Sequence, residues 1–377
     1  MIYIQDKHKC CGCAACVQAC PKHCISFNED EQGFRYPLVD KSHCIDCGLC
    51  DKVCPVINQS EAKKTLKVYA AQNPNDEIRL NSSSGGIFSM LAEAIIDEGG
   101  VVFGACFDKN WEVEHAYTET KEGLVAFRGS KYLQSRTENT YREARDFLNA
   151  GRKVLFSGTS CQIAGLKKFL RKEYENLLTV EILCHSAPSP LVWRKFLEEK
   201  IGDSKIDYIN FRNKSTGWSN YSYSLVIMIA EKNIIIPSDH NYFNGMISNL
   251  TTRPSCSCCP AKNGKSDSDI LLGDCWGIWD YMPSFDDNKG VSLVKIFSSK
   301  GDEFFNKIKS TFIEIDENFV RKYNGGLLDS KKMHKNHDTF FHSLNQISLS
   351  EALDLYISNR KISIGFLRKM LNIILKK

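Results

Sequence analysis

A duplicated run of cysteines near the N-terminus constrains this chain more than any other feature of its sequence. The first run reads Cys10-x-x-Cys13-x-x-Cys16-x-x-x-Cys20-Pro21, and the second, Cys44 to Pro55, repeats every cysteine and the proline at one constant offset. In runs of this kind three thiolates bind one cubane and the fourth reaches across to another. The pattern predicts two 4Fe-4S clusters, one on Cys10, Cys13, Cys16 and Cys54, the other on Cys44, Cys47, Cys50 and Cys20.

Two other uses of clustered cysteines fit the spacing less well. Zinc sites usually take Cys-x-x-Cys pairs separated by a longer spacer, whereas here three cysteines fall within seven residues, twice over. A disulfide scaffold is typical of small exported domains. Cys11 and Cys24 are left over, since only Cys10 keeps the two-residue gap to Cys13, and we interpret both as buried or incidental thiols.

Length, charge and cysteine content set the broad class. The chain has 377 residues, 17 of them cysteine, and a net charge of +4, which argues neither for nor against an anionic partner. No nucleic-acid motif is present, the N-terminal residues lack the apolar segment of a signal peptide, and no apolar run could span a bilayer. We therefore expect a cytoplasmic protein whose cysteines serve metal or redox chemistry, with no nucleic-acid partner and no transmembrane segment.

The pattern of strands and helices divides the chain into three parts. We predict a two-cluster ferredoxin-type domain over residues 1–62, an α/β flavin and iron–sulfur domain over 63–300, and a helical extension over 301–377. Apolar strand patterns alternate with helical ones between residues 66 and 200, which indicates an α/β core with some parallel pairing. Residues 221–237 suggest a hairpin around Glu231-Lys232, and Ile362–Leu375 a terminal helix docked on the domain or lying on a membrane surface.

A cluster domain fused to a larger domain implies a redox group that converts single-electron transfer into two-electron transfer. Cubanes pass electrons singly, whereas most metabolites exchange two, and flavins can do both. No G-x-G-x-x-G follows a strand. The candidate nucleotide loop is Ser83-Ser84-Gly85-Gly86, which runs into a helix, so that its glycines could admit a pyrophosphate to the positive helix end. A serine cap with glycines also begins many helices that bind nothing.

The remaining cysteines form a second candidate site. Cys161 begins a helix, Cys184 ends a strand, and Cys256 and Cys259 share a loop, so all four could meet at one sheet edge and bind a third cluster. Alternatively, the first two are small core residues and only the 256–259 group binds metal. In a third interpretation Cys161 is a nucleophilic thiolate, activated by the helix N-terminus. Spacing does not decide among these.

At these residues the sequence resembles the beta subunit family of coenzyme F420 hydrogenases and dehydrogenases. The resemblance rests on Ser83-Ser-Gly-Gly86, Arg128-Gly-Ser-Lys-Tyr132, Leu155–Gln162, Arg253-Pro-Ser-Cys256 and Gly273-Asp-Cys-Trp-Gly277. It implies an FAD-containing iron–sulfur protein, with Gly129, Ser130, Lys131 and Tyr132 beside the Ser83–Gly86 loop around the flavin. It also favours Cys161, Cys184, Cys256 and Cys259 as the extra cluster site. Ser160, Ser186 and Cys275 depart from the family pattern, and Cys275 puts the fourth ligand in doubt.

These observations lead to one expected function and two alternatives. We expect an iron–sulfur flavoprotein oxidoreductase that passes electrons between 4Fe-4S clusters, supplied by ferredoxin or another one-electron carrier, and a two-electron acceptor through FAD. One alternative is a reductase in polysaccharide or other specialised metabolism with an unidentified small-molecule substrate. The other is an electron-relay subunit that does no chemistry without a hydrogenase or dehydrogenase partner.

Overall fold

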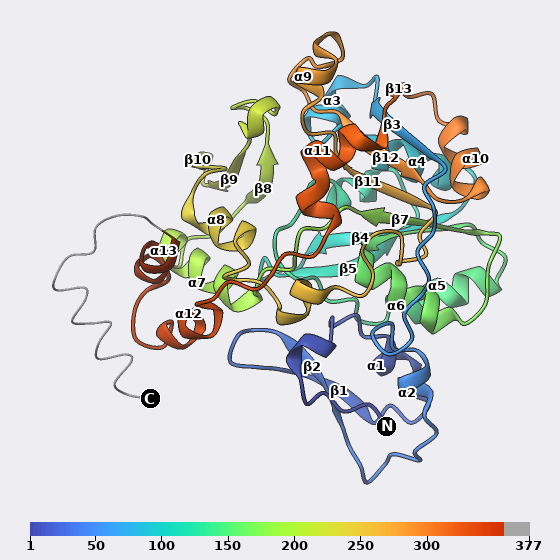
Figure 1. Ribbon diagram of the computed structural model, residues 1–377, viewed down its shortest axis with the longest axis vertical. Helices are drawn as coiled ribbons and strands as arrows, with labels where there is room; N and C mark the ends of the chain where they lie inside the picture. Colours follow the sequence, from blue (N-terminus) through green and yellow to red (C-terminus); the bar gives the residue numbers. More distant parts are fainter. Residues whose placement is uncertain (358–377) are drawn as a thin grey trace.

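The computed structural model describes residues 1–357, and the predicted terminal helix Ile362–Leu375 lies outside the described residues. In this part of the chain no helix is long and apolar enough to cross a membrane. The chain forms an N-terminal module, a large sheet with helices on both faces, and a small three-stranded sheet beside it (Figure 1).

The N-terminal module is built on one antiparallel strand pair and two short helices. Each helix begins inside one of the two cysteine runs, and α1 packs against α5 and α6 of the larger unit. The elements are η1 (Lys7–Lys9), α1 (Ala15–Ala19), β1 (Ile25–Glu29), β2 (Arg35–Val39) and α2 (Leu49–Lys52).

Eight strands form the central sheet in the order β13-β3-β12-β11-β7-β6-β4-β5. β4, β6, β7 and β11 are parallel, and β3 has the same direction because it lies antiparallel to β12, which is antiparallel to β11. The carboxyl ends of these five strands therefore share one edge, where ligands commonly bind. The strands are β3 (Lys67–Gln72), β4 (Val101–Phe107), β5 (Val113–Thr118), β6 (Val154–Thr159), β7 (Leu177–Ile182), β11 (Ile270–Asp274), β12 (Ser292–Ile296) and β13 (Thr311–Glu314).

Helices cover both faces of this sheet because successive strand residues point to opposite sides. Val102 packs with α4 (Ile87–Asp97) and α10 (Ser299–Lys307) on one face, whereas Val101 and Phe103 pack with α5 and α6 on the other. The second face also receives α11. The last three helices are α5 (Thr140–Asn149), α6 (Ser160–Leu170) and α11 (Glu317–Leu328).

The small sheet has its own core of large aromatic side chains. Trp193, Phe211 and Phe243 are fully buried there, between the strands and the surrounding helices. Its elements are α7 (Pro190–Ile201), β8 (Tyr208–Asn213), β9 (Ser224–Ile229), β10 (Lys232–Pro237), α8 (Asn241–Ile247), α12 (His337–Ser343) and α13 (Leu349–Ile357). The connecting segments include η2 (Glu122–Phe127), α3 (Asp76–Leu80), η3 (Ser219–Tyr221), η4 (Pro254–Cys258), α9 (Ile278–Tyr281) and η5 (Pro283–Phe285).

The mixed α/β class with a ferredoxin-type N-terminal domain is confirmed, while the division at residues 62 and 300 stays a prediction. The predicted hairpin exists, but its turn lies one residue earlier, at Ala230 and Glu231, which adopt φ values of 46° and 66°. The segment 301–377, expected to be helical, contains the strand β13 as well as α11. Neither element was predicted individually, since neither segment shows a long apolar pattern.

Candidate functional site

The two cysteine runs adopt the same backbone conformation as well as the same spacing. Gly12 and its counterpart Asp46 have φ values of 71° and 48°, and Ala14 and its counterpart Gly48 have values of 62° and 68°. A left-handed backbone conformation costs free energy at any residue other than glycine. Its recurrence at matching positions of the two runs therefore indicates that the loop imposes it. In both runs the helix begins directly after the second of these residues.

The structure groups the eight cysteines of these runs as the exchanged pattern predicts. One small cavity is lined by Cys10, Cys13, Cys16 and Cys54, and a second by Cys20, Cys44, Cys47 and Cys50. The leftover Cys24 also lines the second cavity, and its Sγ lies 3.5 Å from that of Cys20. Four thiols around one cavity provide the donor set that a cubane needs, so the residues fit the group.

Four further cysteines, contributed by three separate parts of the chain, line a third cavity. Cys161 is in the first turn of α6, Cys184 follows β7, and Cys256 and Cys259 lie in and directly after η4. β6 and β7 are parallel neighbours, so their following residues emerge at the same sheet edge. Two other cysteines near these in sequence are absent from the lining: Cys258 is exposed, and Cys275 is buried beside Trp218 in another core.

Cys11 is buried, as predicted, and it lies between the first and third cavities. It lines both cavities, is 6% exposed, and is hydrogen-bonded through its thiol to Cys13 and Cys161. One of these partners is a predicted ligand of the first cluster and the other a predicted ligand of the third. The ferredoxin-type module is thereby in direct contact with the carboxyl edge of the large sheet.

The acid–base properties of the third group are those of buried thiols. The hydrogen bond that the Cys161 thiol donates to Cys11, together with burial, holds the pKa of Cys161 well above its ordinary value. Burial raises the pKa of Cys256 and of Cys259 to about 12. An activated thiolate nucleophile at Cys161 would require the opposite direction.

Within residues 1–357, no group of three or more His, Cys, Asp or Glu side chains is arranged around a point that suits a single metal ion. A cubane places different demands on its ligands, because each thiolate binds a different iron and the four sulfurs stay farther apart.

Arg253, which opens the Arg253-Pro-Ser-Cys256 motif but was assigned no role from the sequence, is a buried cation beside Cys10 of the first cavity. Its side chain is 1% exposed, lies 4.2 Å from the centre of the Tyr36 ring, and donates to the carbonyl oxygen of Arg35 at 3.0 Å and to Gln134 at 2.9 Å. It also donates to the carbonyl oxygen and the Sγ atom of Cys10. Among the described residues no carboxylate is paired with it.

The two loops predicted to surround a flavin lie side by side. The backbone N–H of Ser130 donates to the hydroxyl oxygen of Ser83 at 2.6 Å, and that hydroxyl donates to Ser130 Oγ at 2.9 Å. Lys131 is half-buried rather than on the surface; its ammonium donates to the carbonyl oxygens of Arg128 and Gly129, and burial lowers its pKa to about 8. Ser83, Gly129, Ser130 and Lys131 thus fit a site for a negatively charged group.

The glycines of the Ser83–Gly86 loop have structural causes of their own. A Cβ atom on Gly85 would lie 2.3 Å from the carbonyl oxygen of Ala71, so this residue lets the loop approach the sheet. Gly86 has φ of 78° at the start of α4. The hydroxyl of Ser84 donates to the carbonyl oxygen of Val291 at 2.7 Å. Close approach of a pyrophosphate is therefore not needed to explain the two glycines.

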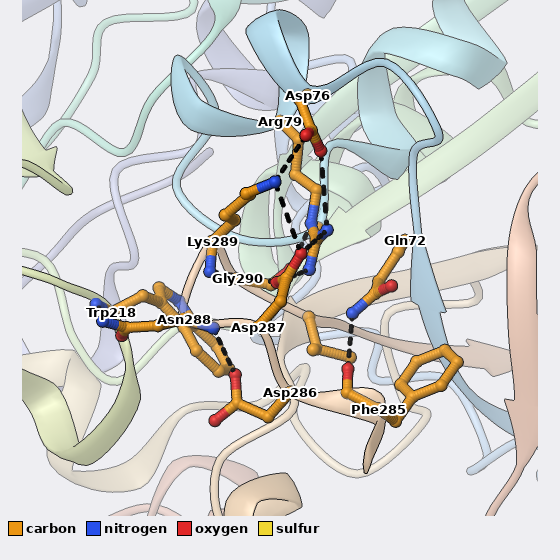
Figure 2. A network of polar contacts seen from close by, with 12 residues as sticks. Gln72, Asp76, Arg79, Trp218, Phe285, Asp286, Asp287, Asn288, Lys289 and Gly290 are labelled. Atoms are coloured by element: carbon orange, nitrogen blue, oxygen red, sulfur yellow. Dashed lines mark hydrogen bonds and ion pairs between the residues drawn. The ribbon is translucent and has the colours of Figure 1, made fainter. Parts of the chain in front are cut away.

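A polar network ties the segment 286–290 to α3 (Figure 2). Arg79 pairs with Asp287 and donates to the carbonyl oxygen of Gly290, and Lys289 pairs with Asp76. The ammonium of Lys214 donates to the carbonyl oxygens of Arg79, Lys289 and Ser84, the last at 2.6 Å. Lys214 thus connects this network to the Ser83–Gly86 loop.

Tyr132 is positioned by a second buried arginine that the sequence analysis missed. Arg212 on β8 donates to the hydroxyl of Tyr132 at 3.0 Å, pairs with both oxygens of Asp274 at 2.9 Å, and lies 3.9 Å from the centre of the Tyr223 ring. It therefore joins the small sheet to the end of β11 and to the Gly129–Tyr132 loop. Because Arg212 is far in sequence from both Tyr132 and Asp274, no local sequence pattern indicates these contacts.

Comparisons with known proteins identify three parts of the chain. The model of the 4Fe-4S dicluster domain matches residues 9–58. The models of the coenzyme F420 hydrogenase/dehydrogenase beta subunit match residues 68–140 with its N-terminal part and 151–318 with its C-terminal part. No curated protein matches the chain significantly.

One solved structure resembles the chain at low similarity. It is a chain of the F420-reducing [NiFe] hydrogenase complex from Methanosarcina barkeri, determined with xenon, and it is 18% identical. The alignment covers 74% of this chain and 92% of that chain, with a TM-score of 0.48. At this level the likeness supports no conclusion about the site.

Proposed function

Because this chain belongs to the coenzyme F420 hydrogenase/dehydrogenase beta subunit family, we propose that it is a three-cluster iron–sulfur flavoprotein that relays electrons to a two-electron acceptor. The two N-terminal cavities would hold the entry clusters, and Cys161, Cys184, Cys256 and Cys259 would hold the third. FAD, bound near Ser83, Gly86 and the loop Gly129–Tyr132, would convert single electrons into pairs.

One observation carries the proposal: Cys11 contacts Cys13 on one side and Cys161 on the other. Electron transfer between two clusters requires that they lie close together, and here the ligand sets are separated by a single side chain. A third cavity elsewhere on the sheet would leave the N-terminal clusters without a connection to the large domain. The first and third cavities share this wall instead.

The flavin part of the proposal is supported by the contact between the two loops and by the half-buried Lys131. An ammonium whose neighbours are carbonyl oxygens, in a partly desolvated place, favours an anionic partner such as a phosphate or a reduced flavin ring. Ferredoxin or another one-electron carrier is the proposed donor, and a hydrogenase or dehydrogenase subunit is the proposed partner of the complex.

Anaerobic titration with reduced ferredoxin tests the electron path. In the wild-type chain, absorbance changes of the clusters and of bound flavin should both appear. Cys184→Ala should retain reduction of the N-terminal clusters and lose rapid reduction of the flavin. A wild-type chain that contains no flavin, and passes electrons only after a larger subunit is added, would instead identify the relay function.

A further inference from the structure

A large cavity between the segment 63–68, one face of the sheet and α11 has no role in the function proposed above. Its volume is about 510 Å³. This volume falls within the range of small-molecule sites, about 300–1,000 Å³. Its lining contains none of the residues expected around the flavin. We call it the linker cavity.

The linker cavity shares a wall with the third cysteine cavity. Ser160, Cys184 and Lys262 line both. A molecule bound in the linker cavity would therefore contact a proposed cluster ligand directly. The three cysteine cavities are much smaller, at 20 to 30 Å³ each, so among these four cavities of the described residues only the linker cavity has room for an organic ligand.

The charges of the lining favour an anion. Three of its lysines are already paired: Lys63 with Asp267, Lys67 with Asp302, and Lys295 with Glu317. Lys64, Lys262 and Arg321 have no ion-pair partner within residues 1–357. The lining also contains the carboxylates of Glu314 and Glu181. The carboxylate of Glu181 already accepts hydrogen bonds from three serines. The lining contains six basic side chains in all, Lys63, Lys64, Lys67, Lys262, Lys295 and Arg321.

Lys262 is the strongest indication of a ligand. Its side chain is 8% exposed, and within residues 1–357 its ammonium donates only to the carbonyl oxygens of His185 and Asp329, each at 3.0 Å. An ammonium has three N–H donors, so one remains, and a buried cation without a counter-charge is costly. An anion in the linker cavity would supply both the acceptor and the charge.

Part of the lining is apolar. This part consists of Leu271 on β11, Leu183 directly after β7, Phe297 beyond β12, and Leu66 in the linker. A ligand that suits the whole lining carries an anionic group and a flat or apolar part. A lining with several cations suits a phosphate better than a carboxylate, because a phosphate offers more acceptor oxygens and more charge.

We propose that the linker cavity binds the small-molecule partner of the oxidoreductase, a phosphate-bearing organic molecule of about mononucleotide size. Its phosphate meets Lys262, Arg321 and Lys64, and its apolar part lies against the sheet beside Cys184. The redox role of this site rests on the proposed function, because it needs Cys184 to hold a cluster. The binding itself does not.

Isothermal titration of the anaerobically purified full chain with two probes tests the site. Inorganic pyrophosphate presents only the anionic group, and flavin mononucleotide adds a planar ring. Both should bind the wild type, the nucleotide more tightly. Lys262→Gln and Arg321→Gln should each weaken both probes about tenfold, the usual loss for one charge-assisted hydrogen bond. Because Arg321 is exposed, its variant folds normally even if the Lys262 variant does not.

Two further variants test whether the loss of affinity is specific to the linker cavity. Leu66→Ser, at a side chain that is 57% exposed, should weaken the nucleotide several-fold and leave pyrophosphate unchanged. Lys307→Gln, which removes an exposed lysine paired with Glu303 outside the cavity, should change neither. Absence of binding for both probes, or affinities unaffected by Arg321→Gln and Leu66→Ser, would overturn the proposal. The expected pattern in a chain that lacks the third cluster would support the cavity and refute the proposed function.

Discussion

The guanidinium of Arg253 donates to the carbonyl oxygen of Cys10 at 2.7 Å and to its Sγ atom at 3.5 Å. Because this arginine is buried and unpaired by any carboxylate in the described part of the chain, the thiolates beside it are its natural counter-ions. Cys256, three residues later, belongs to the third cysteine group. One cation thus lies between two proposed clusters, each of which becomes more negative on reduction.

The first prediction is that Arg253 raises the reduction potential of the cluster on Cys10, Cys13, Cys16 and Cys54. Arg253→Gln should lower that potential by about 60–120 mV, since a hydrogen bond to a charged group contributes about 1.5–3 kcal/mol and 59 mV corresponds to about 1.4 kcal/mol for one electron. Arg253→Lys keeps the charge and should shift it less. Redox titration followed by electron paramagnetic resonance measures both.

The cluster proposed on Cys20, Cys44, Cys47 and Cys50 is the internal control, because Arg253 donates to Cys10 of the first group and to none of these four cysteines in the described part of the chain. Its potential should stay constant in both variants. Equal shifts in the reduction potentials of the two clusters, or identical potentials in Arg253→Gln and Arg253→Lys, would show that the charge of the arginine does not set the potential of the first cluster.

A second prediction concerns the exchange of ligands between the runs. Cys54 lies in the second run but lines the cavity of the first, so Cys54→Ser should alter the signal of the first cluster and spare the second. Cys24→Ser is the matched control, since Cys24 lies beside Cys20 and is not a proposed ligand. If Cys54→Ser disturbs only the second cluster, the two runs bind their clusters separately.

The duplicated run made the N-terminal module predictable, because cysteine spacing determines how a short loop can wrap a cubane. The α/β core with parallel strands was predictable as well, because apolar strand patterns alternate with helical ones along the sequence. The grouping of Cys161, Cys184, Cys256 and Cys259 was only one of three interpretations, since their spacing is irregular. Strand direction explains why these four cysteines line one cavity, because residues that follow parallel neighbours emerge at one edge. Their binding of a cluster stays a prediction.

Long-range contacts account for what the sequence analysis missed. Cys11 shows no motif of its own and matters only because α1 packs on α6. Arg212 and Lys262 are ordinary basic residues in sequence, and their burial depends on elements far along the chain. The explanation of the Ser-Ser-Gly-Gly loop also changed, since Gly85 is required by the carbonyl oxygen of Ala71.

A third prediction tests the flavin site through charge rather than through the glycines. Lys131→Met should reduce bound flavin several-fold after purification, because it removes the cation of the Gly129–Tyr132 loop, which contacts Ser83 through Ser130. Lys121→Met, at an exposed lysine paired with Asp97, should leave the flavin content unchanged. Flavin is measured by fluorescence after acid release. Full flavin content in Lys131→Met would place the flavin elsewhere.

A fourth prediction concerns pH and His115. Burial lowers the pKa of this histidine to about 4, and its ring contacts the carbonyl oxygen of Ser157 and the hydroxyl of Ser135. In the unfolded chain the pKa is about 6.5, so protons bind the unfolded state preferentially and stability falls as the pH drops from about 6.5 toward 4. At pH 5.5 the loss should be about 1 kcal/mol relative to pH 7.5.

His115→Gln removes the titrating group and should remove that part of the pH dependence. Urea unfolding of both proteins at the two pH values gives the difference directly. A variant with the same loss of stability as the wild type would show that His115 does not titrate on unfolding.

The most direct test of the central claim is the iron content of the anaerobically purified chain, compared with that of Cys184→Ala and Cys275→Ala. Three cubanes predict about 12 iron atoms per wild-type chain. Cys184→Ala should hold about 8, with both N-terminal signals intact, and Cys275→Ala, at a buried cysteine outside the third cavity, should equal the wild type. A wild-type chain with about 8 iron atoms, unchanged by Cys184→Ala, would contradict the third cluster and the electron path built on it.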